Sequence, residues 1–164
     1  YQEASDLFIN KLSNFLCTSA TYEIKIWADH DIFLGEDWHN RIQTEIKRSD
    51  LSILLLSDDF FNSKYIKNNE MNVFIDQQRE SGYPFIPIYF SPCEYKDWEA
   101  IKKSQLFKPD KDDFEEVNSK DFAFTSLLYK GPTLVDGAEN SPNVNYYFKI
   151  LRRKLEEVFM NIKK

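Results

Sequence analysis

The stretch LSILLLSDDFFNSKYIKNNE, which runs from Leu51 to Glu70, decides the fold. It opens on a nearly uninterrupted apolar run, which is typical of a strand that is buried on both faces of a parallel sheet. The Ser-Asp-Asp that follows favours a turn and a helix cap. From about Ser63, a candidate N-cap, we expect a helix that carries Glu70 roughly two turns in. Glu70 would then lie near the carboxyl end of a parallel strand, where open α/β sheets form their ligand crevices.

The spacing around Glu70 leaves two interpretations open. Glutamate is rarely buried, so a solvated residue on the helix surface is the ordinary interpretation. Ile66, Val73 and Phe74 lie at i−4, i+3 and i+4, however, so Glu70 stands beside the apolar stripe of its helix and not opposite to it. Spacing alone does not choose between a surface residue and a site residue.

The rest of the chain alternates between helical and strand-like patterns. This alternation indicates an α/β fold, in which a doubly wound, flavodoxin-like parallel sheet is flanked by helices on both faces. Such folds open on a central strand, whereas this chain opens on a helix, so we expect a first strand upstream of Tyr1. The expected helices cover residues 2–18, 37–48, 95–101 and 144–162, and the expected strands cover residues 23–27, 51–56, 84–90 and 122–129. The prolines of the strand at 84–90 favour an edge position or a strand margin.

Length and composition describe an ordinary globular protein. The 164 residues are 42% hydrophobic and 29% charged, which predicts one folded domain over residues 1–164. The net charge of −6 argues against nucleic acid as the main partner, because phosphate binding needs a basic surface. Cys17 and Cys93 do not make a disulfide framework, so we expect a reducing, cytoplasmic compartment. The sequence shows neither a signal peptide nor an apolar run of membrane length, so we expect no membrane partner.

Several familiar kinds of site are missing from the sequence. The four glycines lie far apart, so neither a dinucleotide-binding GxGxxG nor a phosphate-binding P-loop is present. His30 and His39 lack metal-ligand spacing, and we expect no metal. Asp29, His30 and Asp31 would fit a loose oxygen-rich metal site, but we favour a solvated acidic loop. A Ser or Cys triad stays open, although no GxSxG supports it.

Three segments together resemble the Toll/interleukin receptor (TIR) domain family, in particular its bacterial branch. They are WADHDIFLGEDW from Trp27 to Trp38, the stretch that ends at Glu70, and FIPIYFSPCEY, and they come in the family's order and spacing over roughly residues 3–106. The resemblance implies a five-stranded parallel sheet whose first strand precedes Tyr1. The chain departs from the pattern in a slightly shorter loop after Trp27 and in a longer, irregular segment over residues 107–142, where 122–129 is our candidate for the fifth strand.

The resemblance also implies an activity. Many bacterial TIR domains cleave NAD⁺ between nicotinamide and ribose, so NAD⁺ would be a substrate and no cofactor is expected. Glu70 matches the family's catalytic glutamate. Asp29 and Phe33 lie in or beside the loop that borders the family's pocket, and Trp38 would either close that pocket or anchor its helix. Ser57 would either contact the ligand or cap the following helix.

In this family the loop over residues 28–36 often docks on a neighbouring domain, and assembly completes the active site. Ile32, Phe33, Leu34 and Gly35 fit an oligomer interface, because exposed apolar loop residues indicate a partner surface. The alternative is that they tuck under their own domain. The resemblance thus favours an assembly-activated effector of a bacterial anti-phage defence protein with a sensor elsewhere. A non-catalytic adaptor that only recruits other TIR domains is the alternative, and a response-regulator-like domain fits poorly because its phosphoacceptor aspartate is lacking.

Overall fold

The computed structural model describes residues 2–28, 38–62, 80, 84–114, 117 and 121–162. Its main elements are α1 (Gln2–Leu16), α2 (Trp38–Arg48), β1 (Ser52–Leu56), α3 (Asp58–Asn62), β2 (Phe85–Tyr89), α6 (Glu99–Lys102) and α7 (Pro142–Ile162). Between α6 and α7 lie short elements: η2 (Lys111–Asp113), η3 (Phe124–Leu127), β3 (Tyr129–Lys130), β4 (Thr133–Leu134) and η4 (Ala138–Asn140). The helices predicted at both ends of the chain and the two apolar strands are confirmed.

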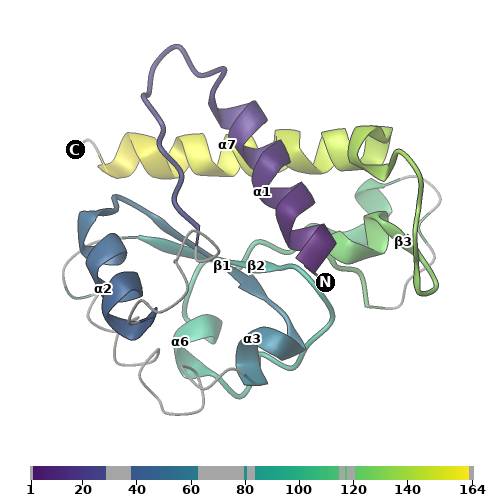
Figure 1. Cartoon of the computed structure of the whole chain (residues 1–164), viewed down its shortest axis with the longest axis horizontal. Helices are drawn as coiled ribbons and strands as arrows, with labels where there is room; N and C mark the ends of the chain where they lie inside the picture. Colours follow the sequence, from purple (N-terminus) through teal and green to yellow (C-terminus); the bar gives the residue numbers. More distant parts are fainter. Residues whose placement is uncertain are drawn as a thin grey trace.

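β1 and β2 are parallel neighbours, and their register runs from Ser52 opposite Phe85 to Leu56 opposite Tyr89. Successive side chains of a strand point to opposite faces, so each strand contributes side chains to two hydrophobic cores. Figure 1 shows the long helix α7 and helix α1 on one side of these strands and α2, α3 and α6 on the other. This arrangement confirms the α/β class, while the five-stranded sheet stays a prediction.

The first core lies under α1 and α7 and is rich in aromatic rings. Phe8 of α1 is 1% exposed, and its ring centre lies 5.1 Å from that of Phe124 and 5.2 Å from that of Phe148. The strands contribute alternate residues to this core, namely Leu51, Ile53, Leu55, Ile86, Ile88 and Phe90. Helix α7 contributes Val144, Tyr147, Phe148, Leu151, Leu155 and Val158, which recur at helical spacing. Burial of apolar side chains therefore packs α1, near the start of the chain, against α7, near its end.

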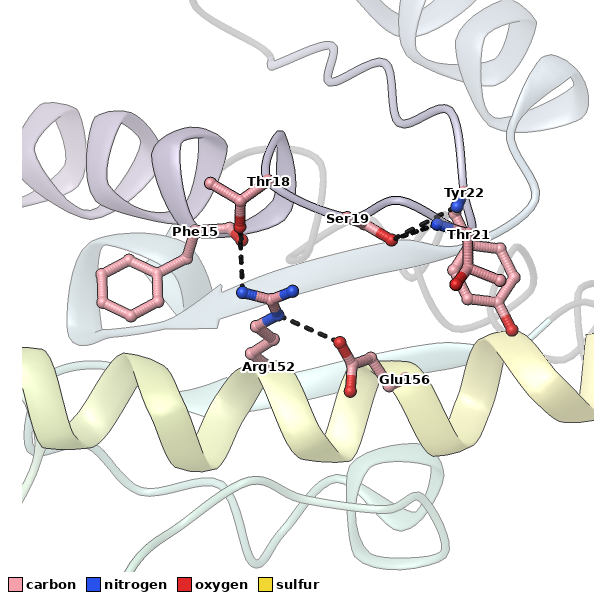
Figure 2. Close-up of polar contacts among 7 residues, drawn as sticks. All are labelled: Phe15, Thr18, Ser19, Thr21, Tyr22, Arg152 and Glu156. Atoms are coloured by element: carbon pink, nitrogen blue, oxygen red, sulfur yellow. Dashed lines mark hydrogen bonds and ion pairs between the residues drawn. The ribbon is translucent and has the colours of Figure 1, made fainter.

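Polar contacts add to this junction at the end of α1 (Figure 2). Arg152 of α7 donates from Nη1 to Thr18 Oγ1 at 2.9 Å and from Nε to Glu156 Oε1 at 3.0 Å. Ser19 Oγ accepts the backbone N–H groups of Thr21 and Tyr22, which turns the chain away from α1. The side chain of Arg152 thus bridges the exit of α1 and the surface of α7.

The second core covers the other face of the strands. Leu56 of β1, Phe85 of β2 and Ile101 of α6 are its buried members. The partly buried side chains around them come from α2, β1, α3 and the segments before and after α6, and they are Ile46, Leu54, Phe60, Phe61, Cys93, Tyr95, Trp98 and Leu106. Because both faces of β1 and β2 meet apolar side chains, the continuous apolar pattern of these strands follows from their position.

The strand predicted at residues 23–27 is wrong, because residues 22–28 contain no strand. In the flavodoxin-like order this segment pairs with the first strand of the fold. Among the described residues, no strand pairs with this segment. Ile24 still packs against the first core, whereas Ile26 is 39% exposed.

The strand predicted at residues 122–129 is also wrong. Residues 124–127 form the 3₁₀ helix η3, and Ser126 Oγ accepts the N–H of Ala123 at 3.0 Å, which stabilises this turn. Phe107 instead lies beside β2 as an isolated parallel bridge, because its N–H donates to Pro87 O at 2.8 Å and its O accepts from Tyr89 N at 3.0 Å. The nitrogen of Pro87, which has no hydrogen, therefore faces the side where, among the described residues, β2 is paired by this bridge alone, which fits the edge preference of proline.

A short helix, α3, occupies the residues after β1 for which the sequence predicted a turn and a helix cap. Helix α3 starts at Asp58, directly after the strand, because Ser57 provides its cap. The predicted helix start at Ser63 lies outside the described residues.

Candidate functional site

Ser57 connects the carboxyl end of β1 to α3. Its Oγ accepts the N–H of Phe60 at 3.1 Å and its carbonyl accepts the N–H of Phe61 at 3.2 Å. These bonds are those of an N-cap residue, and they place Asp58 in the first turn of the helix. The capping role proposed for Ser57 is therefore observed, while its contact with a ligand stays a prediction.

The carboxyl end of β2 lies against that of β1, because Ser91 N–H donates to Leu56 O at 3.0 Å. At this edge the hydroxyl of Tyr89 donates to Asp121 Oδ1 at 2.6 Å and accepts the backbone N–H of Cys93 at 3.4 Å. A hydrogen bond to a carboxylate is stronger than a neutral one. Tyr89 thereby ties residue 121, which is distant in sequence, to the end of β2.

Lys108 contacts the aromatic ring of the same tyrosine. Its Nζ lies 4.2 Å from the centre of the Tyr89 ring and 5.6 Å from that of Tyr95, which is cation–π distance. Residues 108 and 121 both belong to the irregular segment over residues 107–142. Two parts of that segment therefore meet at Tyr89. We call Asp58, Tyr89, Cys93, Lys108 and Asp121 the carboxyl-edge cluster.

Burial and nearby negative charges keep two groups of the carboxyl-edge cluster protonated, namely the Cys93 thiol and the Tyr89 hydroxyl. Burial, followed by the nearby carboxylates of Asp58 and Asp121, raises the pKa of the Cys93 thiol to about 12. Burial and the hydrogen bond to Asp121 also raise the pKa of Tyr89. Cys93 is therefore a protonated thiol at neutral pH and a poor nucleophile, which speaks against the Cys triad that the sequence left open.

An aromatic stack borders this edge. The rings of Phe61 and Trp98 are stacked with centres 5.4 Å apart, and Phe60 meets Phe61 edge to face at 5.2 Å. Both Phe61 and Trp98 pack against the second core. Helix α3 is thus fixed to the segment before α6.

Most of the predicted site residues lie outside the described residues. These are the catalytic candidate Glu70, the pocket candidates Asp29 and Phe33, and the interface candidates Ile32, Leu34 and Gly35. Trp38 is the first residue of α2, but its side chain is not among those described. All of these assignments stay predictions.

The segments on either side of residues 29–37 are in contact. The guanidinium carbon of Arg41 in α2 lies 5.9 Å from the centre of the Trp27 ring, and Arg41 Nη2 pairs with Glu45 Oε1 at 3.0 Å. Trp27 and Arg41 therefore bring together the two ends of the loop for which the sequence predicts docking.

The carboxyl-edge cluster contains residues that sequence reasoning missed. Tyr89, Lys108 and Asp121 are far apart in the chain and belong to no recognised spacing. The one usable signal was a tyrosine in an otherwise apolar strand, since a buried hydroxyl needs a partner. The partners of Tyr89 depend on the path that the chain takes after Phe107, and the sequence pattern did not predict that path.

A pocket of about 400 Å³ lies elsewhere, at the amino end of β2 between the residues after α6 and the last turns of α7. Its lining includes the charged residues Lys103, Lys154 and Glu157 and the apolar residues Phe85 and Val158. It contains no predicted site residue. We regard the carboxyl edge as the better candidate, because parallel sheets bind ligands there.

Two kinds of feature are absent from the described residues. Within these ranges no group of three or more His, Cys, Asp or Glu side chains is arranged to hold a metal ion. Among the same residues, none of the helices combines the length and the apolar character that a membrane crossing requires.

Comparison with known proteins identifies the family. Residues 1–119 match the family described as TIR domain, which is well over half of the chain. The chain therefore belongs to the TIR domain family.

Two curated relatives match shorter stretches. Over 72 residues, 44% of this chain and 22% of the relative, it is 33% identical to the uncharacterized protein y4lF of Sinorhizobium fredii (strain NBRC 101917 / NGR234). Over 75 residues, 45% of this chain and 21% of the relative, it is 31% identical to the probable 2' cyclic ADP-D-ribose synthase TcpO of Methanobrevibacter olleyae. The match spans about a fifth of the length of each relative. No solved structure matches the chain.

Proposed function

We propose that this TIR domain is an NAD⁺ glycohydrolase, which cleaves the bond between nicotinamide and ribose. The observation that carries the proposal is family membership over residues 1–119, together with a relative that is named as a probable cyclic ADP-ribose synthase. An ADP-ribosyl group is what remains of NAD⁺ when nicotinamide leaves. The matched residues include Glu70, the proposed catalytic residue.

A single carboxylate suits this reaction. Nicotinamide is bound as a pyridinium and leaves as a neutral molecule, so no general acid has to protonate it. The ribose develops oxocarbenium character in the transition state, and a nearby negative charge stabilises that cation. Glu70 would supply this charge and hold the ribose hydroxyls. Attack of water on the ribosyl cation completes hydrolysis, whereas attack by another hydroxyl of the same ADP-ribosyl group, with loss of its proton, gives a cyclic ADP-ribose.

The described carboxyl edge supports the proposal by its position. Ser57 and Asp58 follow β1 directly, and the chain reaches Glu70 twelve residues after Asp58 (58 to 70). The ends of β1 and β2 are held together by the Ser91 to Leu56 hydrogen bond. Asp29, Phe33, Trp38 and Ser57 remain the proposed substrate contacts, and NAD⁺ is a substrate and not a cofactor.

Nicotinamide release from NAD⁺ tests the proposal. The concentrated protein is assayed with a crowding agent or a fused oligomer, because assembly through Ile32–Gly35 is part of the proposal. Glu70→Ala and Glu70→Gln should each lower turnover by about 10²- to 10³-fold, since a transition-state electrostatic contact is lost. Glu94→Gln, which changes an exposed carboxylate after β2, is the matched control and should keep the wild-type rate. Equal turnover in the Glu70 variants and the wild type would refute the site assignment.

The alternative function is that of an adaptor that binds other TIR domains without catalysis. A well-folded, assembled protein without turnover would favour it. An effector role in anti-phage defence, a sensor elsewhere, and a cytoplasmic location belong to the same proposal.

A further inference from the structure

Lys108 stands at the carboxyl edge with its charge exposed. It directly follows Phe107, whose bridge to Ile88 places it beside the end of β2. Its ammonium lies over the Tyr89 ring at 4.2 Å and near the Tyr95 ring at 5.6 Å. Within the described residues no ion pair holds Lys108, whereas Lys102 and Lys103 both pair with Glu99.

The surroundings of Lys108 extend to the end of β1. The Cys93 thiol is influenced by the charge of Asp58, at the start of α3, and by that of Lys108. Asp58 and Lys108 therefore both lie within electrostatic range of Cys93. The other charges that act on this thiol, Glu94 and Asp121, are negative. Among the charges that act on the Cys93 thiol, Lys108 is the positive one.

We propose that Lys108 binds the diphosphate of the dinucleotide substrate. This inference rests on the proposed function and assigns a phosphate-binding residue to the same edge. A cation–π contact occupies one side of an ammonium and leaves N–H groups on the other side for an anion. In a chain of net charge −6, a dianionic diphosphate needs such a local cation.

The two tyrosines give the ammonium a fixed place. Tyr89 is 3% exposed and its hydroxyl is bound to Asp121, so the ring under Lys108 does not move freely. A pre-positioned lysine loses less side-chain entropy when it binds a ligand. The competing explanation is that Lys108 only covers the two rings.

The two reaction products distinguish these explanations, because ADP-ribose carries the diphosphate and nicotinamide does not. The inhibition constant of each product and the calorimetric affinity for ADP-ribose are measured for the wild type and for Lys108→Met and Lys108→Arg. In Lys108→Met, binding of ADP-ribose should weaken about tenfold or more, as expected for a lost hydrogen bond to a charged group. Inhibition by nicotinamide should not change. Lys108→Arg should keep most of the affinity, and Lys102→Met, which alters a lysine that is already paired, should behave as the wild type.

Each outcome decides a separate point. Unchanged ADP-ribose affinity in a Lys108→Met protein that still releases nicotinamide would overturn the role of Lys108 and leave the proposed function in place. An equal loss for both products would show that Lys108 only supports the packing. A wild type that neither cleaves NAD⁺ nor binds ADP-ribose would refute both the proposed function and this inference.

Discussion

Replacement of Phe148 by alanine tests whether α7 completes the domain, although it lies beyond the residues that match the family. Phe148 is 0% exposed, and its ring centre lies 5.2 Å from that of Phe8 in α1 and 5.6 Å from that of Phe124. Truncation of a buried phenylalanine costs about 3–5 kcal/mol, because transfer free energy is lost and a cavity is left. Folded domains have a free energy of unfolding of about 5–15 kcal/mol, so this one change removes a large share of the stability.

Urea unfolding followed by far-UV circular dichroism measures the effect. With a slope of about 2 kcal/mol/M, the midpoint of Phe148→Ala should fall by about 1.5–2.5 M. Lys149→Ala, which changes the exposed neighbouring residue, is the matched control and should stay within about 0.5 kcal/mol of the wild type. A Phe148→Ala midpoint equal to that of the control would refute the packing of α7 against α1.

Three further changes test single residues. Tyr147→Phe should raise the free energy of unfolding by about 1 kcal/mol in the same urea titration, because the fully buried hydroxyl has no hydrogen-bond partner among the described residues; a loss of stability would reveal a partner. Ser57→Ala should lower it by about 1 kcal/mol through loss of the α3 cap; no change would show that the cap is dispensable. Burial raises the pKa of Cys93 from 9.0 to about 12, so the unfolded state releases this proton first and stability should fall as the pH rises from 9 towards 12. In Cys93→Ser that fall should be smaller, and an equal fall in alkaline thermal unfolding would contradict the burial of the thiol.

Apolar patterns in the sequence predicted the strands that are buried on both faces and the long helix that is buried on one face. The runs that became β1 and β2 are apolar on both faces because each strand lies between α1 and α7 on one side and α2, α3 and α6 on the other. The spacing of Tyr147, Leu151 and Leu155 likewise predicted α7, because this stripe faces the first core. These patterns involve residues that are close in sequence, and the structure contains the strands and the helix that they predicted.

Features that depend on distant partners could not be predicted in the same way. The pattern of residues 23–27 is that of a strand, but a strand also needs a neighbour to pair with. The edge of β2 is bridged by Phe107, which is a single residue with no strand-like run around it. Tyr89, Lys108 and Asp121 meet only because the chain leaves β2 and returns to it. Their approach is a tertiary event with no local signature.

The products formed from NAD⁺ test the central claim most directly. Wild-type protein, assembled as above, is incubated with NAD⁺, and all products are quantified by liquid chromatography and mass spectrometry alongside Glu70→Gln. The account predicts one nicotinamide for each NAD⁺ consumed, with the remainder as linear or cyclic ADP-ribose, and no such products from Glu70→Gln. Consumption that yields AMP and nicotinamide mononucleotide, or nicotinamide release that persists without the Glu70 carboxylate, would contradict it.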